Sequence, residues 1–436
     1  MISDLERGKA TVELEKTLKI NGTSVYVGGI IGDTPASASF MYSPEYLSNP
    51  ESCPISISLP LTGTPFSPEQ TKTFFDGLLP EGFTRRCVAS WMHVDENDYL
   101  SILAGLGHEC LGAVRIVAQN SPHLPPEYRR LTDAEAKNLA REGAAESAQL
   151  ITKSHLSLTG ASGKVGLYYD EKNNQWYLPV GDAPSTHIVK QSHVRLQEIV
   201  ANEQLCLLTA RNLGIDIPES FIVNIGDFSD GDVLFATRRY DRKIHPDARI
   251  INGLSVPYRL HQEDFAQALG IASANKYERE HEDYLNRMFA LLRAYSADPM
   301  TDQLKLWDIC IYNYLIGNTD NHIKNLSLLY SPDLKSIRLA PAYDIISTVI
   351  YESSTENMAL SIGGIYKLNE ITKQSFEAQA KHIGLGTNLA MKRFDAMVSH
   401  FHEALNKAVI DLELQGFVHA HDLKEKILAR GGIRRQ

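Results

Sequence analysis

Cysteine is scarce in this sequence of 436 residues, and no two cysteines form a CxxC pair. The five cysteines lie far apart, at Cys53, Cys87, Cys110, Cys206 and Cys310. An odd and scattered set of this kind favours reduced thiols over a disulfide framework. The sequence therefore argues against a disulfide-stapled protein, and we expect a cytoplasmic one.

Long apolar runs and an excess of positive charge are also missing. No stretch reaches the length of a bilayer span, and residues 1–16 lack the apolar core of a secretory signal. The 43 Lys and Arg residues against 53 Asp and Glu residues give a formal net charge of −10. Binding to DNA phosphates needs a basic face, so we expect neither a membrane partner nor DNA binding by the chain alone.

The composition that is present is typical of a globular protein with several domains. Hydrophobic residues make up 43% of the chain and charged residues 22%, and a chain of this length is expected to form two or three domains. We expect an α+β subdomain in residues 1–150, a small lobe in residues 151–255 and a helical large lobe in residues 256–436.

Residues 1–150 combine strand and helix signals. Asn21-Gly22 supplies the positive φ angles of a tight turn and predicts a β-hairpin. Ile55–Leu59 alternates apolar and polar residues, which predicts a half-buried strand. Ser67–Gln70 has the capping-box pattern, with proline at the first helical position, and predicts the start of a helix.

From residue 151 onward, the order of expected elements is that of a kinase small lobe followed by a helical lobe. Strands are expected at 165–170, 176–180, 186–190, 221–225 and 233–237, with a helix at 197–213. The connection between the lobes is expected at 238–241. Further helices are expected at 262–269, 284–295 and 302–316, followed by two long helices at the C-terminus.

A polar loop after the expected helix 302–316 carries the strongest chemical signal. Its Asp320 and Asn325 have the D-x-x-x-x-N spacing of a kinase catalytic loop. In that loop the Asp accepts the proton of the attacking hydroxyl and the Asn binds a metal ion. Asp344 follows after a second short strand, where a DFG-like Asp binds the metal ions that bridge the ATP phosphates. Asp and Asn are also ordinary turn residues, but the order of elements favours phosphoryl transfer.

Three further groups fit a nucleotide site, each with a structural alternative. Lys190 ends an apolar strand and would pair with Glu203 on the next helix, as in kinases; the alternative is a solvated Lys and an exposed Glu. His322 would touch a phosphate or brace Asp320, or serve only as a structural hydrogen bonder. A glycine-rich loop between two strands would cradle phosphates, or only shape a hairpin; its residues are Thr159, Gly160, Ala161, Ser162, Gly163 and Lys164.

In this order of motifs the chain resembles the HipA toxin kinases. The motifs of the C-terminal part are Leu158–Ala161 with Lys164, Thr186–Lys190, Asn202-Glu203, Arg239–Arg242, Gln262–Asp264, Asn318–Asn325 and Tyr343–Ile346. Those of the N-terminal part are Ile57–Leu61, Phe74–Gly82 and Leu111–Val114. The resemblance spans nearly the whole chain. It departs at Ser162-Gly163, where the family commonly has Gln-Glu, and at Arg238, where an acidic residue is frequent.

The resemblance implies an α+β, protein-kinase-like bilobal fold related to phosphoinositide kinases. It implies a serine/threonine protein kinase that uses ATP and Mg²⁺, with Asp320 catalytic and with Asn325 and Asp344 as magnesium ligands. Ser157 falls where family members autophosphorylate and shut themselves off. The implied ATP-binding residues are Thr159, Gly160, Ala161, Ser162, Gly163, Lys164, Lys190, Glu203, Arg238, Arg239, Tyr240, Gln262, His322, Asn325 and Asp344.

The resemblance also implies partners. These are a small helix-turn-helix antitoxin of the HipB type, operator DNA bound mainly through that antitoxin, and a protein substrate such as glutamyl-tRNA synthetase or a related aminoacyl-tRNA synthetase. Two alternatives stay open on the sequence alone. One is a small-molecule kinase that uses the same Asp, Asn and Asp residues for catalysis and metal binding. The other is a catalytically idle co-repressor that acts with an antitoxin.

Overall fold

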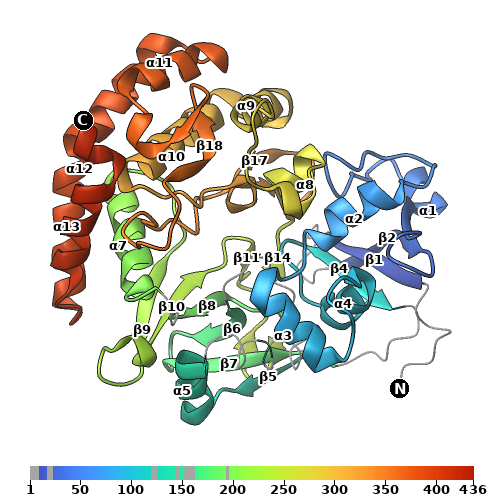
Figure 1. Ribbon diagram of the computed structural model, residues 1–436. Helices are drawn as coiled ribbons and strands as arrows, with labels where there is room; N and C mark the ends of the chain where they lie inside the picture. Colours follow the sequence, from blue (N-terminus) through green and yellow to red (C-terminus); the bar gives the residue numbers. More distant parts are fainter. Residues whose placement is uncertain are drawn as a thin grey trace. The chain divides into compact units, whose positions relative to one another are not determined.

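The computed structural model describes residues 9–16, 23–118, 125–142, 148, 150, 163–192 and 196–436 (Figure 1). The chain divides into two compact units. The first comprises Met1–Gln191, Ala236–Ser273 and Leu329–Ser336, and the second comprises Ser192–Phe235, Ala274–Leu328 and Ile337–Gln436. The expected boundaries near residues 150 and 255 stay a prediction.

The first unit begins with an antiparallel sheet in the order β3-β2-β1-β4. Its strands are β1 Lys9–Lys16, β2 Thr23–Ile31, β3 Ser39–Tyr42 and β4 Val114–Ala118, and its helices are α1 Pro44–Ser48, α2 Pro68–Asp76, α3 Gly82–Met92 and α4 Tyr99–Leu106. The predicted hairpin is confirmed, because β1 and β2 pair from Lys16 opposite Thr23. Asn21-Gly22 itself lies outside the described residues.

Helix α2 begins as the sequence predicts and packs onto this sheet. Ser67 accepts a hydrogen bond from the Gln70 backbone, and the Gln70 side chain accepts one from the Ser67 backbone. The helix buries Phe74 and Phe75, and the Phe75 ring lies 5.3 Å from the ring of Phe40 on β3.

The strand predicted at Ile55–Leu59 is wrong. This segment is a turn, closed by a hydrogen bond from the Leu59 backbone to the Ser56 carbonyl oxygen, with a single β-bridge between the two residues. The cause is a distant carboxylate. Glu263 accepts the backbone N–H of Ile57 at 3.1 Å, and its Oε2 lies 2.5 Å from Ser56 Oγ. These bonds take the place of strand pairing.

A second sheet has six strands in the order β5-β7-β6-β8-β10-β9. Those of the first unit are β5 Glu127–Arg130, β6 Lys164–Asp170, β7 Gln175–Val180 and β8 His187–Gln191. Strand β10 Val233–Arg238 begins in the second unit and ends in the first, and β9 Ser220–Asn224 belongs to the second. The five strands predicted at 165–170, 176–180, 186–190, 221–225 and 233–237 are confirmed. The other elements of the first unit are α5 Asp133–Glu142, β11 Arg242–Lys243, β12 Ile250–Ile251, β13 Leu254–Ser255, β14 Tyr258–Arg259, β15 Gln262–Asp264 and α8 Phe265–Leu269.

The helix predicted at 262–269 is right only in its second part. Asp264 caps α8 by accepting the Gln267 backbone N–H, and the Gln267 side chain accepts the Asp264 N–H in return. This capping box starts the helix at Phe265. Gln262 therefore lies on strand β15. Its side chain points in a different direction from the one it would take in the predicted helix.

The second unit is mostly helical. Its elements are α7 Ile199–Asn212, β9 Ser220–Asn224, α9 Tyr284–Tyr295, α10 Pro299–Ile316, β17 Ile337–Leu339, β18 Asn357–Ile362, β19 Ile365–Lys367, α11 Lys373–His382, α12 Thr387–Leu414 and α13 Ala420–Arg430, with short 3₁₀ turns at Asp230–Asp232, Ile323–Asn325, Leu368–Glu370 and Gly432–Arg435. Strand β16 Ser327–Tyr330 begins here and ends in the first unit. Helix α12 packs along α7 and α10 (Figure 1). The core includes the rings of Trp307 and Phe376, 5.7 Å apart. Among the described helices, none combines the length and apolarity that crossing a bilayer requires.

Candidate active site

The predicted site residues fall into three groups. Ser157, Thr159, Gly160, Ala161 and Ser162 lie outside the described residues. The first unit holds Gly163, Lys164, Lys190, Arg238, Arg239, Tyr240 and Gln262, and the second holds Glu203, Asp320, His322, Asn325 and Asp344.

The candidate catalytic loop begins where helix α10 ends. Gly317 ends the helix at φ +69°, and a Cβ at this position would stand 2.2 Å from Val349 Cγ2. Only glycine combines this backbone conformation with so close an approach. Asn318 then donates its side-chain amide to Asn313 Oδ1 at 2.7 Å, one helical turn back. The loop therefore leaves the helix in one fixed direction.

Hydrogen bonds within the loop bring Asp320 and Asn325 together. Asn325 Nδ2 donates to the Asp320 carbonyl oxygen at 2.9 Å, and the backbone N–H of His322 donates to the same oxygen at 2.8 Å. The Asp320 N–H donates to Asn318 Oδ1 at 3.1 Å. Because Asn325 uses its nitrogen in this way, its Oδ1 is the atom that a cation would bind. The loop holds its aspartate exposed and its asparagine buried.

The segment around Asp344 is tied to this loop on one side and to the end of helix α10 on the other. Tyr343 donates its hydroxyl to the Lys324 carbonyl oxygen at 3.0 Å, and Ser347 donates its hydroxyl to the Ile316 carbonyl oxygen at 2.6 Å. Asp344 lies between these anchors, half-buried and at φ +56°. A left-handed aspartate costs about 1 kcal/mol and is a common mark of functional loops. The sequence prediction that Asp344 lies beside the loop is consistent with these contacts.

Helix α7 is fixed to the Asp344 segment through Asn202. Its Nδ2 donates to the Ser347 carbonyl oxygen at 2.9 Å, and its Oδ1 accepts the Ser347 N–H at 3.3 Å. The neighbouring Glu203 is buried rather than exposed, so the alternative of a solvated glutamate is wrong. Lys190 belongs to the other unit, and its pairing with Glu203 stays a prediction.

Lys164 and Lys190 are cross-strand neighbours on β6 and β8. Directly opposed residues of an antiparallel pair have their side chains on the same face of the sheet. Two positive charges on one face of the sheet are compatible with the phosphate binding that the sequence predicts for both residues.

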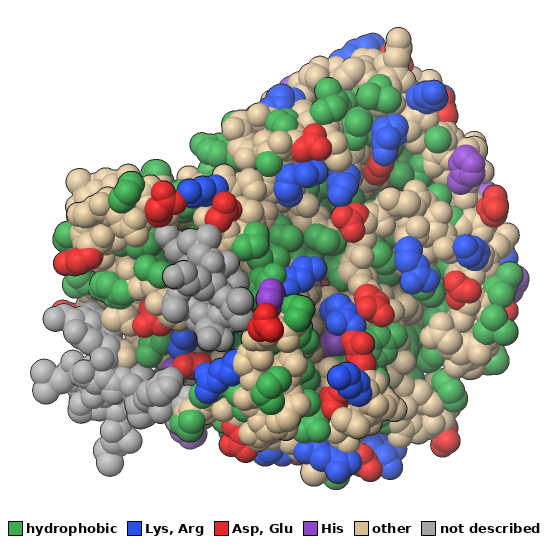
Figure 2. Space-filling model, turned by 180° about the vertical axis from the view of Figure 1, so that it is seen from behind, with side chains coloured by type: hydrophobic (Ala, Val, Ile, Leu, Met, Phe, Trp, Pro, Cys, Tyr) green, Lys and Arg blue, Asp and Glu red, His purple; other side chains and the backbone are tan. Residues whose placement is uncertain are grey.

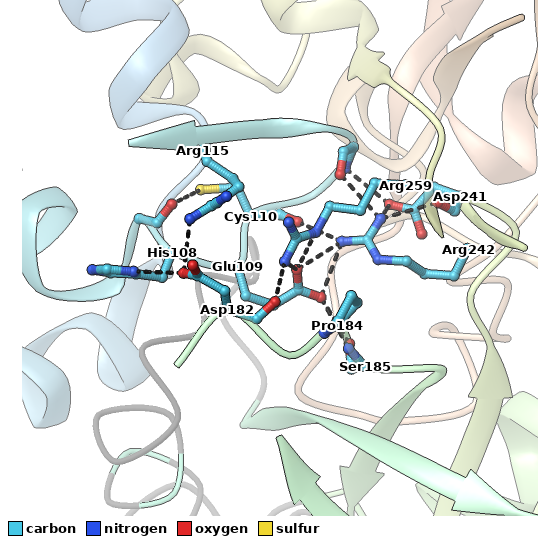
Figure 3. A network of polar contacts seen from close by, with 12 residues as sticks. His108, Glu109, Cys110, Arg115, Asp182, Pro184, Ser185, Asp241, Arg242 and Arg259 are labelled. Carbon is cyan, nitrogen blue, oxygen red and sulfur yellow. Dashed lines mark hydrogen bonds and ion pairs between the residues drawn. The ribbon is translucent and has the colours of Figure 1, made fainter. Parts of the chain in front are cut away.

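The predicted connection at 238–241 is built into a buried ionic network (Figure 3). Arg239 donates to Glu109 Oε1 at 3.0 Å and binds both carboxylate oxygens of Asp241, at 2.9 and 2.8 Å. Its guanidinium is fully buried, so a nucleotide contact at this position would use the main chain. Arg238, by contrast, forms an exposed ion pair with Glu171.

Glu109 is the centre of this network. Arg242 and Arg259 also donate to its carboxylate. Burial alone would raise the pKa of Glu109, but the charges of Arg242, Arg259 and Arg239 outweigh burial and lower the pKa to about 2. No sequence pattern points to Glu109, because its arginine partners lie 130 to 150 residues further along the chain.

Gln262 and Tyr240 are connected to the network through Asp241. Gln262 Nε2 donates to Asp241 Oδ2 at 3.1 Å, and the Tyr240 hydroxyl donates to Gln262 Oε1. The Gly112 N–H donates to the same Asp241 oxygen at 2.9 Å. Burial would raise the pKa of Asp241, but Arg239 and Arg242 keep it well below its usual range. The side chains predicted to lie near the nucleotide are therefore held by an ionised carboxylate.

No sequence pattern points to Tyr277, which contacts Asp320. The Tyr277 hydroxyl donates to Asp320 Oδ1, and its ring meets the His322 ring edge-on, with centroids 5.1 Å apart. Tyr277 lies in an irregular segment before α9, without a motif or a periodic pattern.

A cavity of about 620 Å³ lies elsewhere in the second unit. Its walls come from Gln197, Glu198, Ala201, Asp227, Phe228, Ser229, Asp230, Val233, Gly416, Phe417, Val418, His419 and Ala420. No predicted site residue lines it, so it is separate from the catalytic loop.

Comparisons with known proteins agree on one family. A family model described as the HipA-like C-terminal domain matches residues 156–407, and one described as the HipA N-terminal domain matches residues 18–117. A relative from Sinorhizobium fredii, named putative kinase Y4mE, is 33% identical over 398 residues, covering 88% of this chain and 90% of the relative. The serine/threonine-protein kinase toxin HipA of Shewanella oneidensis is 26% identical over 395 residues, covering 86% of each chain.

Among solved structures, the chain is similar to HipA of Shewanella oneidensis in its complex with HipB and operator DNA. The TM-score is 0.76 at 23% identity, with 98% of this chain and 97% of that chain covered. The likeness shows the fold, and the predicted kinase-like α+β fold is confirmed.

Proposed function

The chain belongs to the HipA family, and on that premise we propose that it is a serine/threonine protein kinase of a toxin–antitoxin pair. The reaction is transfer of the ATP γ-phosphate to a protein hydroxyl. The observation that carries the proposal is the closed loop that joins Asp320 and Asn325 and is tied to the segment of Asp344. The names of two relatives, a putative kinase and a serine/threonine-protein kinase toxin, support it.

Asp320 is the group that accepts the proton of the attacking hydroxyl. Its carboxylate is exposed, so a hydroxyl on another protein can reach it. Its main chain is fixed at both the N–H and the carbonyl oxygen, which limits the positions that the carboxylate can take. Phosphoryl transfer depends mainly on such positioning and on neutralising charge.

The donor set fits a hard cation and a nucleotide. Asn325 Oδ1 and the half-buried Asp344 carboxylate are oxygen ligands of the kind that Mg²⁺ prefers. Bound there, Mg²⁺ would neutralise the phosphate oxygens of ATP. In this proposal Lys190 and Lys164 hold the phosphates, and Tyr240 and Gln262 contact the adenine. Glu203 and His322 are further proposed ATP-binding residues. In this proposal the glycine-rich residues 159–164 cover the phosphates.

We propose that autophosphorylation at Ser157 inactivates the kinase. Ser157 directly precedes the glycine-rich loop, and a dianionic phosphate at this point would repel the phosphates that the loop binds. The family resemblance at Leu158–Ala161 supports this position. The state of Ser157 would therefore decide whether an intact catalytic loop is active.

The proposed partners are a small helix-turn-helix antitoxin, operator DNA held mainly through it, and an aminoacyl-tRNA synthetase as substrate. The related HipA structure is a complex with HipB and operator DNA, which supports the first two. Figure 2 shows basic and acidic side chains interspersed over one face of the described residues, and the net charge is −10. Both features fit DNA contact through a partner better than through this chain alone. The proposed location is the cytoplasm.

The test is incubation of the full chain with Mg²⁺ and ATP, followed by intact-mass and peptide mass spectrometry. We expect phosphate on Ser157 in the wild type and none in Asp320→Asn. Asp247→Asn, an exposed carboxylate outside the site, is the matched control and should behave as the wild type. Phosphorylation of free sugars or aminoglycosides instead of protein would favour a small-molecule kinase. An absence of ATP binding at every Mg²⁺ concentration would favour the idle co-repressor.

A further inference from the structure

The catalytic loop fixes the main chain of Asp320 through hydrogen bonds at two atoms. The N–H and the carbonyl oxygen are bonded to Asn318 and Asn325. An exposed aspartate can still rotate about χ1 and χ2, and its terminal torsion has a broad energy profile. Contacts to the carboxylate itself therefore decide the plane that it takes.

Tyr277 supplies such a contact. Its hydroxyl donates to Asp320 Oδ1, and a carboxylate has acceptor positions on both of its oxygens. We propose that Tyr277 is a positioning residue for phosphoryl transfer: it fixes the Asp320 carboxylate through Oδ1 and thereby directs Oδ2 toward the attacking hydroxyl. This inference rests on the proposed kinase function.

The ring of Tyr277 is itself in contact with two other side chains. Its ring is packed edge-on against His322, at 5.1 Å and an interplanar angle of 87°. The ammonium of Lys276 lies 5.5 Å from the centre of the ring. The side chain keeps 45% of its surface exposed, so the contact with Asp320 lies where a protein substrate would arrive.

The next residue, Glu278, anchors the segment of Tyr277. Its carboxylate accepts the backbone N–H of Tyr284, at the start of α9, at 2.9 Å and that of Ser361, on β18, at 2.5 Å. The Glu278 N–H donates to the Ala359 carbonyl oxygen at 3.0 Å. A residue that orients a catalytic group must be fixed by such supporting contacts. Glu278 gives Tyr277 this support.

The tyrosine is chemically unchanged by the phosphoryl transfer step. The substrate hydroxyl oxygen forms a bond to the γ-phosphorus, the bond from phosphorus to the ADP oxygen breaks, and the hydroxyl proton passes to Asp320 Oδ2. Tyr277 keeps its own proton throughout and donates it to Oδ1 as a hydrogen bond. Tyr277 acts only on the orientation of the Asp320 carboxylate. The rate of a reaction between bound groups depends strongly on such orientation.

The test is the rate of autophosphorylation measured against ATP concentration for Tyr277→Phe, Tyr277→Ala and a control, Tyr295→Phe. Tyr295 is an exposed tyrosine at the end of α9. In Tyr277→Phe we expect the rate at saturating ATP to fall about tenfold. The ATP concentration for half the maximal rate should change less than about twofold, because no contact with the nucleotide is lost. Tyr277→Ala should be no faster than Tyr277→Phe, and Tyr295→Phe should equal the wild type.

A double variant distinguishes a positioning role of Tyr277 from a purely structural role. In an Asp320→Asn background, Tyr277→Phe should have no further effect on the residual rate, because the oriented group is already gone. An unchanged or higher rate in Tyr277→Phe, with Asp320-dependent activity in the wild type, would overturn the inference and leave the kinase function standing. A higher rate would mean that the phenol competes with the substrate hydroxyl. Absence of Asp320-dependent phosphorylation in the wild type would overturn both.

Discussion

Glu109 and Arg242 form a two-pronged ion pair inside the first unit, with Arg242 Nη2 3.0 Å from Oε1 and 3.1 Å from Oε2 of Glu109. Each side chain is only 1% exposed. Glu109 lies in the part of the chain that matches the HipA N-terminal domain, and Arg242 in the part that matches the C-terminal domain. The two family domains are therefore joined by buried charges and not only by the chain.

Replacing Glu109 should destabilise the protein severely. Glu109→Gln leaves Arg239, Arg242 and Arg259 with less negative charge to neutralise them, and breaking a buried ion pair costs about 3–5 kcal/mol. Urea unfolding measures the loss. The control is Glu377→Gln, which breaks an exposed ion pair with Lys381 on α11 and should cost less than about 1 kcal/mol. Equal losses in the two variants would show that the network contributes no more than a surface pair.

The stability of the protein should depend on pH through Glu263. Burial raises the pKa of this carboxyl from 4.5 to about 7, against the hydrogen bonds from Ser56, Tyr330 and Ile57. Between these two values the folded chain holds a proton that the unfolded chain has released. The stabilisation is complete below pH 4.5 and is lost as the pH rises through 7, by at most about 1.4 kcal/mol per pH unit.

Glu263→Gln tests this dependence, because glutamine is permanently neutral and can keep the contacts with Ser56 and Tyr330. The melting temperature of the variant minus that of the wild type should increase from pH 5 to pH 8. Glu403→Gln, which replaces an exposed carboxyl on α12, corrects for general charge effects. A difference that stays constant across this range would contradict the predicted titration.

Alanine at Gly317 should displace the catalytic loop. Its Cβ would stand 2.2 Å from Val349 Cγ2, at φ +69°. Gly214 has a similar φ of +79° but nothing within 4 Å of the added atom. Gly214→Ala therefore measures backbone strain alone, about 1 kcal/mol. Gly317→Ala should lose about 1–3 kcal/mol more in thermal unfolding and lower the autophosphorylation rate. Equal losses in both variants would mean that Val349 moves aside freely.

Replacing Asp344 should change the need for magnesium without unfolding the protein. Asparagine tolerates the left-handed conformation at φ +56° but lacks the negative charge that binds Mg²⁺. We expect Asp344→Asn to keep the wild-type melting temperature and to need at least about tenfold more Mg²⁺ for half-maximal autophosphorylation. Asp247→Asn is again the control. A magnesium titration that matches the wild type would remove Asp344 from the metal site.

What the sequence could predict was decided by distance along the chain. Asp320 and Asn325 lie in one loop, so their spacing alone indicates their relation. Five strands of the second sheet have local strand patterns and were predicted within a residue or two, whereas β5 was not predicted. Tyr277 and Asp320 are 43 positions apart, in segments without a shared pattern, and only the folded chain brings them together.

The two wrong assignments have the same cause. Ile55–Leu59 alternates like a strand, but its backbone is bonded to Glu263, more than 200 positions away. Gln262 lies in a helix-like pattern, but Asp264 caps the helix two residues later. In both places a side chain competes with the regular structure that local sequence favours.

The separation of Glu109 from its arginines has a consequence for how the protein is made. Glu109 leaves the ribosome early, and Arg239, Arg242 and Arg259 follow only 130 to 150 residues later. Contacts between such distant positions form late, because a long loop must close first. During synthesis the N-terminal part must therefore keep a solvated carboxylate at the surface that it will later bury. Its final folding step then waits until the second half of the chain has emerged.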